Sequence, residues 1–164
     1  MAEPAPEITL TAVASKRRIA LNAVTTPTLL MLFDQGTSTQ IDPVLSAVRE
    51  VWPTADLVQI ANVVDLRKFP KIVRKVAETL LTNSYKQNAK NVKEGRDPAD
   101  YVIILPDWQA KVMKAVGIDD VSTRIAIAVV APGGRLIGAY QGEGEGAKAV
   151  EMLREAVGEG LAPE

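Results

Sequence analysis

The 164-residue sequence contains no cysteine and no histidine. Without cysteine, the chain has no disulfide, no thiol nucleophile, no iron–sulfur cluster and no thiolate-ligated zinc. Without histidine, every catalytic triad and every acid–base scheme that depends on an imidazole is excluded as well. Two absences thus remove most of the chemistry by which small α/β domains act as thiol or hydrolytic enzymes.

Long apolar runs and an excess of one charge are also missing. The longest apolar runs, such as residues 125–131, are far shorter than the roughly 20 residues that a membrane helix needs. The first residues lack the basic and apolar regions of a signal peptide. Nineteen Lys and Arg against twenty Asp and Glu leave a net charge of -1, which gives no general attraction to nucleic acid or anionic lipid. We expect a cytoplasmic protein with neither a nucleic-acid nor a membrane partner.

The remaining composition is that of a globular protein, with 47% hydrophobic and 24% charged residues. Its length fits one domain, which we expect to span residues 1–164. Prolines and glutamates near the start, and glycines near the end, predict loose termini at residues 1–7 and 158–164.

Hydrophobic periodicity predicts an alternation of strands and helices. Residues 8–13 and 19–24 alternate as a hairpin would, and residues 28–33 form a continuous apolar run typical of a buried strand. Further strands are expected at 55–64, 101–105, 124–131 and 135–140, and helices from Ser38 or Thr39 to 52, from 70 to about 92, at 108–116 and at 147–157. This order predicts an α/β fold with a central mixed sheet flanked by helices and an N-terminal β-hairpin extension.

Three stretches carry a resemblance to a known family. The opening A-P-E-I-T-L at 5–10 is similar to "A-P-x-F-x-L", residues 101–118 resemble "P-V-L-x-D…A-Y-G-V", and residues 125–137 resemble the hairpin "F-L-I-D-x-x-G-x-I". The chain therefore resembles thioredoxin-like proteins of the redoxin or peroxiredoxin type, the alkyl hydroperoxide reductase and thiol-specific antioxidant proteins. The resemblance implies a thioredoxin-like sheet with its site in the loop that opens the first long helix.

The sequence departs from that family at the reacting position. The family places a reactive cysteine at this helix N-terminus, where the helix dipole lowers the thiol pKa. Here Thr37 matches the threonine of "T-x-x-C" and Gln40 stands in place of the cysteine. The family's cis-proline also has no counterpart in residues 122–124, where we expect a trans chain. Thiol-dependent peroxidase or oxidoreductase activity is excluded. We expect a redox-inactive redoxin-like protein that acts as a binding or assembly module, with no catalytic residue and no cofactor.

The loop itself remains a candidate ligand site. Free amides at a helix start, together with hydroxyls and one cation, could bind a small anion. The candidate residues are Asp34, Thr37, Ser38, Thr39, Gln40 and Arg124. The simpler interpretation is that the hydroxyls cap the helix and that Arg124 pairs with Asp34 or Asp120. The same loop carries the alternative functions, a cysteine-independent enzyme, a small-anion binder or a residual antioxidant role.

A second candidate is the basic segment 67–96, which has nine Lys and Arg against two Glu and hence a charge of +7. Such asymmetry could dock an acidic protein partner. The candidate partner-binding residues are Lys71, Arg74, Lys75, Lys86 and Lys90. The simpler interpretation is a solvated helix face. Redoxins often pair, so a homodimer is a further possibility.

Two weaker patterns predict no site. Residues 142–147 superficially match G-x-G-x-x-G, but Glu143 and Glu145 would repel a pyrophosphate and no βαβ unit follows. Asp119 and Asp120 offer oxygen ligands without an EF-hand pattern. We therefore expect no metal site.

Overall fold

The structure is a computed structural model, and it describes residues 3–161. The strands in this range are β1 (Glu3–Pro4), β2 (Thr9–Thr11), β3 (Arg18–Ala20), β4 (Thr28–Phe33), β5 (Gln59–Asp65), β6 (Ile104–Asp107), β7 (Ala126–Ala131) and β8 (Arg135–Tyr140). The α-helices are α1 (Ile41–Val51), α2 (Arg74–Ala89), α3 (Pro98–Tyr101), α4 (Lys111–Ala115) and α5 (Glu145–Leu161). Three 3-10 helices complete the list, η1 (Leu21–Ala23), η2 (Gln35–Gln40) and η3 (Lys71–Val73).

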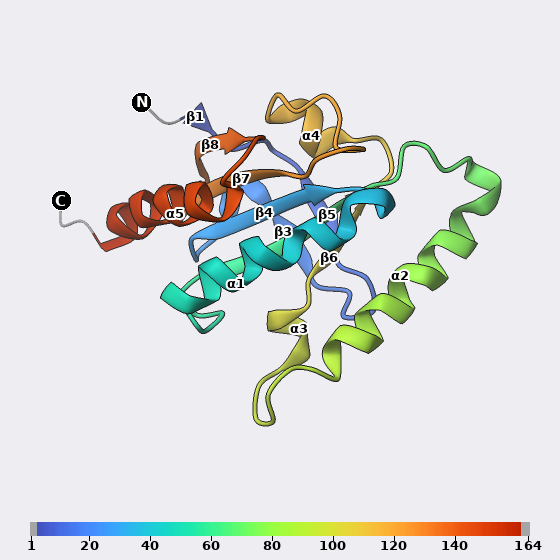
Figure 1. The fold of residues 1–164 in the computed structure, drawn as a ribbon, viewed down its shortest axis with the longest axis horizontal. Coiled ribbons are helices and arrows are strands. Elements are labelled where there is room, and N and C mark those ends of the chain that lie inside the picture. Colours follow the sequence, from blue (N-terminus) through green and yellow to red (C-terminus); the bar gives the residue numbers. More distant parts are fainter. Residues whose placement is uncertain (1–2, 162–164) are drawn as a thin grey trace.

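The main sheet is mixed, with the strand order β1-β8-β7-β4-β5-β6 (Figure 1). Strands β4, β5 and β6 run parallel, whereas β7 pairs antiparallel with both β4 and β8. β4 lies at the centre, and all six of its residues are buried, which agrees with its continuous apolar sequence. Parallel β4, β5 and β6 bring their carboxyl ends to one edge of the sheet, where open α/β sheets commonly place their sites.

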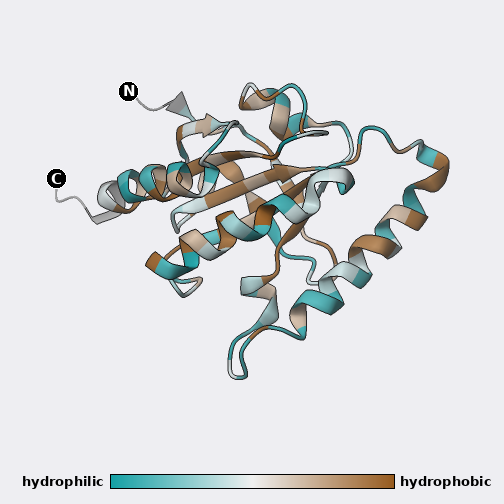
Figure 2. Ribbon diagram, viewed as in Figure 1, coloured by the Kyte–Doolittle hydropathy of each residue, from teal (hydrophilic) through white to brown (hydrophobic). Residues whose placement is uncertain are grey.

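Side chains from alternate positions of the strands form two cores, one on each face of the sheet (Figure 2). On one face, Leu30 and Leu32 of β4 pack with α4 and with the hairpin β2–β3. On the other face, Leu29, Met31 and Phe33 pack with α1 and α5. The period-two alternation of β4 thus supplies both layers, because successive side chains of a strand point to opposite faces.

Helix α2 is the least integrated element. Ala77 is its only buried residue, and Figure 1 shows it running along the outside of the molecule, away from α5. At its start, the guanidinium of Arg74 lies 4.7 Å from the ring centre of Trp108. Further along, Leu81 and Tyr85 reach the core that α1 also covers. Among the described helices, none has both the length and the apolar character required to cross a membrane.

The predicted fold is confirmed. The chain is an α/β protein with a mixed sheet between helices, and β2 and β3 form the expected N-terminal antiparallel hairpin. The predicted order of strands and helices holds, with β1 and the one-turn helix α3 as additions.

Several predicted boundaries are wrong for identifiable reasons. Neither Ser38 nor Thr39 caps the first long helix, because Asp34 caps η2 and this 3-10 turn continues directly into α1. Tyr101 belongs to α3, and the strand begins at Ile104. This strand includes Pro106, which is tolerated since β6 lies at the sheet edge.

The remaining corrections concern helix ends. The helix predicted to reach about residue 92 ends at Ala89, and the one predicted over 108–116 covers only Lys111–Ala115. The termini are also more ordered than expected where the structure describes them. Glu3 and Pro4 pair with β8, and α5 continues through residues 158–161. The rest of the predicted loose ends, residues 1–2 and 162–164, lies outside the described residues.

Candidate functional site

An aspartate stands at the carboxyl end of each parallel strand. Asp34 follows β4, while Asp65 and Asp107 are the last residues of β5 and β6 and are paired in register. Asp65 and Asp107 are buried and Asp34 is half-buried. Three carboxylates therefore lie along one edge of the sheet, beside the loop in which the sequence predicted a site.

Each of these carboxylates already has structural partners. The Asp34 carboxylate accepts a hydrogen bond from the Gly36 amide at 2.8 Å. Asp65 pairs with the Arg67 guanidinium at 3.1 Å. Asp107 accepts the amides of Lys111 and of the next residue at 2.8 and 2.9 Å, and so caps α4. A carboxylate that is fully engaged in this way is poorly placed to act as a general base.

The Thr37 hydroxyl holds the loop to the segment before β7. Thr37 is 1% exposed. Its Oγ1 donates to the Val121 carbonyl at 2.9 Å and accepts from the Asp34 amide at 3.1 Å. A hydroxyl has one proton and two lone pairs, so these bonds satisfy most of its capacity. The first residue of the T-x-x-Q motif is therefore a structural contact rather than an exposed ligand.

Gln40 makes the second connection between the same two segments. Its Nε2 donates to the Thr123 carbonyl at 3.1 Å, and its Oε1 accepts from the Ile125 amide at 3.1 Å. This bidentate arrangement uses both ends of the carboxamide. All peptide bonds of the described chain are trans, including those in the segment that Gln40 contacts. The trans chain that the sequence predicted there is confirmed.

The structure pairs the Arg124 guanidinium with residues outside the loop 34–40. The Arg124 guanidinium donates to the Gly142 carbonyl at 2.8 Å and lies 3.6 Å from the Glu145 carboxylate. Its ion pair is therefore with Glu145, and the alternative pairing with Asp34 or Asp120 is wrong. The cation nearest Asp34 is Lys68, at 3.8 Å.

Ser38 and Thr39 are exposed on η2. The Ser38 hydroxyl donates to the Gln35 carbonyl at 3.3 Å. Beside them, Asp34, Asp65, Lys68 and Ser122 line a shallow hollow of about 390 Å³. Its two carboxylates are paired with Lys68 and Arg67, so the hollow has no excess of positive charge to attract a small anion.

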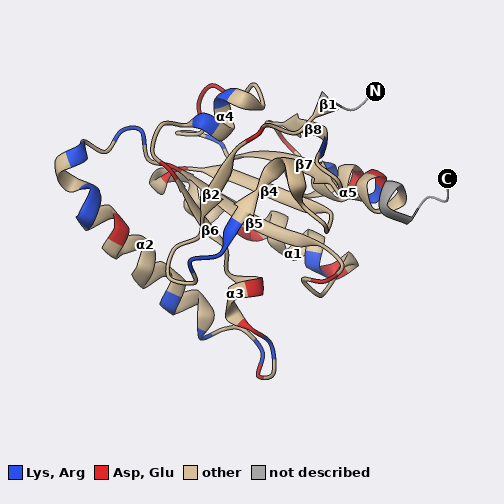
Figure 3. Ribbon diagram, turned by 180° about the vertical axis from the view of Figure 1, so that it is seen from behind, with Lys and Arg blue, Asp and Glu red and all other residues tan. Residues whose placement is uncertain are grey.

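The five candidate cations of the basic segment differ in their surroundings. Lys71, Lys75, Lys86 and Lys90 are exposed along η3, α2 and the helix end (Figure 3). Arg74 is half-buried against Trp108 and so holds α2 in place. Only the four lysines are therefore free to meet a partner.

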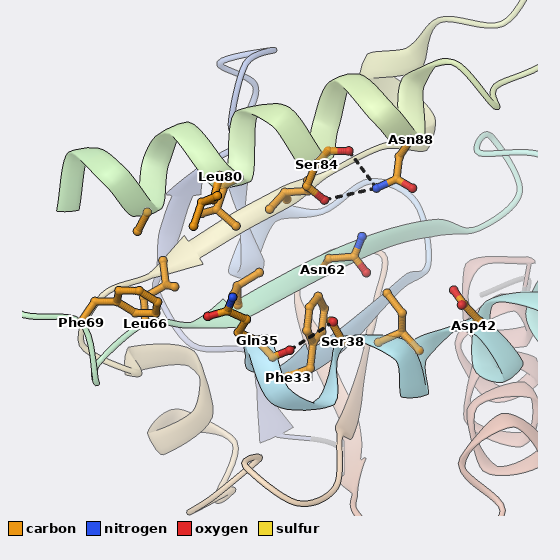
Figure 4. Close-up of a pocket in the computed structure, with 15 residues that line it drawn as sticks. Phe33, Gln35, Ser38, Asp42, Asn62, Leu66, Phe69, Leu80, Ser84 and Asn88 are labelled. Atoms are coloured by element: carbon orange, nitrogen blue, oxygen red, sulfur yellow. Dashed lines mark hydrogen bonds between the residues drawn. The ribbon is translucent and has the colours of Figure 1, made fainter. Parts of the chain in front are cut away.

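The sequence prediction missed a groove between α1 and α2. Figure 4 shows one end of it, a hollow of about 370 Å³ in which Gln35 and Ser38 of η2 face Leu80 and Ser84 of α2. Its floor includes Asn62, whose side-chain oxygen is buried and has no hydrogen-bond partner. The available signal was an asparagine inside the otherwise apolar strand Gln59–Asp65.

Among the charged groups near these sites, three have shifted pKa values, and one of them is Arg49 beside the groove, where burial lowers the pKa of the guanidinium. Burial raises the pKa of the Glu145 carboxyl above its usual range, against the opposing effects of the Gly142 backbone and Arg124. The Ser122 backbone amide, which donates to Asp120, lowers the pKa of that carboxyl. No group of three or more acidic side chains in the described range is arranged to hold a metal ion.

The sheet order, together with a capped loop that leads from the central strand into α1, is that of a thioredoxin-like fold. Solved structures agree with this class. The exposed lipoprotein thioredoxin of Streptococcus pneumoniae is 19% identical with a TM-score of 0.59, and the match covers 92% of this chain and 99% of that one. A thiol:disulfide interchange protein of the thioredoxin family from Chlorobium tepidum is 14% identical with a TM-score of 0.58, covering 96% and 98%. StoA from Bacillus subtilis is 14% identical with a TM-score of 0.56, covering 91% and 98%.

These identities support the fold alone. No protein-family profile matches the chain, and no curated protein matches it. The similar structures are thioredoxin and thiol:disulfide proteins, so they support the thioredoxin-like part of the predicted resemblance but not its narrower peroxiredoxin-type part.

Proposed function

We propose that this chain is a redox-inactive thioredoxin-like protein that acts as a binding module for an acidic protein partner. The observation that carries the proposal is the state of the loop 34–40. Thr37 and Gln40 have the spacing of the two cysteines in a C-x-x-C motif. Their side chains instead fasten the loop to residues 121–125 by three hydrogen bonds. An amide and a hydroxyl held in this way have neither the nucleophilicity of a thiolate nor the freedom to exchange partners.

An enzyme or small-anion binder that uses the same loop has less support. The Arg124 guanidinium is engaged with Gly142 and Glu145. The neighbouring hollow is lined by Asp34 and Asp65, whose charges are matched by Lys68 and Arg67. A site for an anion would need cations that are not already paired.

The proposed binding surface is the basic face around α2. Lys71, Lys75, Lys86 and Lys90 are exposed there, and none of them forms an ion pair with a described residue. The segment 67–96 has a charge of +7 in a chain with a net charge of -1. Such a patch steers an acidic partner toward this face more than it adds affinity.

The ancestry of the scaffold is a secondary part of the proposal. The similar structures are thiol:disulfide proteins, whereas the opening A-P-E-I-T-L motif resembles peroxiredoxins. Both origins place a reactive thiol at the start of α1, so both predict that a chain without this thiol has no thiol-dependent activity.

The test combines activity with thiol restoration. We expect wild-type protein to reduce neither hydrogen peroxide nor a protein disulfide above the buffer rate, and turnover well above that rate would overturn the proposal. In Gln40→Cys, the new thiol lies at the start of α1, where we expect a lowered pKa. The matched control is Ser46→Cys, an exposed position within the same helix. At neutral pH, iodoacetamide should alkylate Gln40→Cys about tenfold faster. Equal rates would show that this helix start does not activate a thiol, and would remove the support for redox ancestry.

A further inference from the structure

We propose that the groove between α1 and α2 binds an extended acidic peptide segment, a proposal that rests on the proposed function because it names the contact that the protein partner makes. The groove consists of two hollows of about 370 and 600 Å³. They meet at four residues that line both, Ile41, Asp42, Asn62 and Asn88. The result is one continuous channel, bounded by α2 at the first hollow and by α1 and residues 88–102 at the second.

The dimensions of the groove favour an extended chain over a helix. The α2 residues that line the hollow of about 370 Å³ run from Ala77 to Asn88. At a rise of 1.5 Å per residue, this is a distance of about 16 Å. About five extended residues cover that length. A helix with its side chains is about 10 Å across, too thick for a hollow of about 370 Å³ between two elements that already face each other.

The polar groups in the groove favour a peptide over an acyl chain. The Asn62 side-chain oxygen is buried without a partner at the junction of the two hollows. A buried acceptor without a partner is unfavourable, and a peptide N–H would satisfy it. Asn88 also faces this junction, and Figure 4 shows it above Asn62, with Ser84 beside it. An acyl chain would leave these amides without partners, whereas a peptide backbone offers both donors and acceptors.

Apolar side chains in the hollow of about 370 Å³ can contact the apolar residues of a bound peptide. Phe33, Leu66, Phe69 and Leu81 line it together with Leu80, which is 51% exposed. Helix α2 adds Val76, 60% exposed one turn before Leu80. Covering exposed apolar side chains with a partner is favourable, so this stripe indicates a surface on which a partner can pack.

The charged side chains of the groove determine in which direction the peptide binds and that the peptide is acidic. Beyond the end of α2, Lys93 and Arg96 line the second hollow, the one of about 600 Å³. Lys93 forms no ion pair with a described residue, and Arg96 lies over the Tyr101 ring at 5.0 Å. Asp42 lies at the junction, so carboxylates of the peptide belong at the Lys93 end and not in the middle.

A second copy of this chain is a poorer occupant. A twofold contact between two α2 helices would bring together two segments that each have a charge of +7. Like charges at an interface are repulsive and suppress such pairing. The same charge attracts an acidic segment of another protein.

The experiment selects peptides without assuming their sequence. Full-length wild-type protein is used to select from a displayed library of random peptides of about ten residues, a length that exceeds the span of the groove. Counter-selection uses Asn88→Trp, in which an indole fills the junction of the two hollows. We expect the enriched peptides to combine Asp or Glu with apolar residues. Enrichment of basic peptides, or no enrichment over the counter-selection, overturns the proposal.

Two charge reversals on the same segment then locate the contact. Lys93→Glu lies in the groove, whereas Lys86→Glu lies with Lys75 and Glu78 on a different side of α2. We expect Lys93→Glu to weaken the selected peptide about tenfold and Lys86→Glu to weaken it less than about threefold at physiological salt. Unchanged circular dichroism and thermal unfolding confirm that each variant is folded. Light scattering of the wild-type protein tests whether a second copy of the chain occupies the groove. A stable dimer that Asn88→Trp prevents would overturn the assignment of the groove to a peptide.

The outcomes separate this inference from the proposed function. If acidic peptides bind and Lys86→Glu weakens them as much as Lys93→Glu, while Asn88→Trp has no effect, the basic face binds acidic partners and the groove proposal fails. If wild type turns over peroxide or a disulfide, the proposed function fails whatever the peptides do.

Discussion

The Thr37 hydroxyl offers the sharpest test of the loop's structural role. Thr37→Val replaces the hydroxyl by a methyl group of similar size, so it removes hydrogen bonds without opening a cavity. Two groups then lose their partner, the Val121 carbonyl at 2.9 Å and the Asp34 amide at 3.1 Å. Thr37 is 1% exposed, so water cannot easily replace its hydroxyl.

The magnitude follows from those two groups. A buried polar group left unsatisfied costs about 1–3 kcal/mol. With one of the two groups at the half-buried Asp34, the free energy of unfolding should fall by about 2–4 kcal/mol. For a chain of this length, that corresponds to a decrease in Tm of roughly 5–15 °C.

Urea unfolding followed by circular dichroism measures the change, with the slope of the transition expected to stay constant. Ser38→Ala is the matched control, because its hydroxyl makes one exposed bond of 3.3 Å within the same loop. We expect that variant to lie within about 0.5 kcal/mol of wild type. If Thr37→Val is equally neutral, the loop does not depend on its contact with Val121, and the reasoning about a fastened loop is refuted.

Two further predictions concern the far end of the sheet and the α5 start. Burial raises the pKa of Glu145, so the folded state holds its proton more tightly than the unfolded state, and stability is lost as pH rises from the usual glutamate pKa through the raised one. Glu145→Gln should therefore gain stability relative to wild type as the pH rises above the usual glutamate pKa of about 4.3, as measured by urea unfolding; parallel pH profiles would contradict the burial effect. Gly133 and Gly134 both have positive φ, but only at Gly134 would a Cβ overlap the Asn22 backbone. Gly134→Ala should lower the free energy of unfolding by at least about 2 kcal/mol more than Gly133→Ala, and equal losses would contradict the steric argument.

The sequence predicts the strands of this fold better than its helix ends. β4 and β7 are continuous apolar runs of strand length, and both are completely buried. Helix starts were less predictable, because several residues at each start could serve as caps. Asp34 competes with Ser38 at η2, and Asp107 ends β6 while its carboxylate caps α4. Which residue caps depends on where the preceding strand ends, and that is a tertiary property.

The position of the candidate site in the fold was predictable from the sequence, but the partners of its side chains were not. The resemblance implied a site in the loop that opens the first long helix, and the structure places Thr37 and Gln40 there, hydrogen-bonded to Val121 and Thr123. The direction of Arg124 was not predictable, because its partner Glu145 is a neighbour only after β8 and α5 have packed. The groove left a single local signal, Asn62 in an apolar strand, and its walls come from segments that lie far apart in the sequence.

The two sides of η2 differ in how they are packed. A reacting cysteine must remain accessible to its substrate, and this keeps the start of the helix open. With Thr37 and Gln40 in place, the side of η2 facing residues 121–125 can close, and hydrogen bonds hold it closed. On the other side, Gln35 and Ser38 of the same turn line the groove whose opposite wall is α2. Because Ala77 is the only buried residue of α2, the fold gains little from that wall in the absence of an occupant. The hydrogen-bonded side therefore offers no reactive group, and the open side, with its unpaired Asn62 oxygen, is where the proposed binding role would be located.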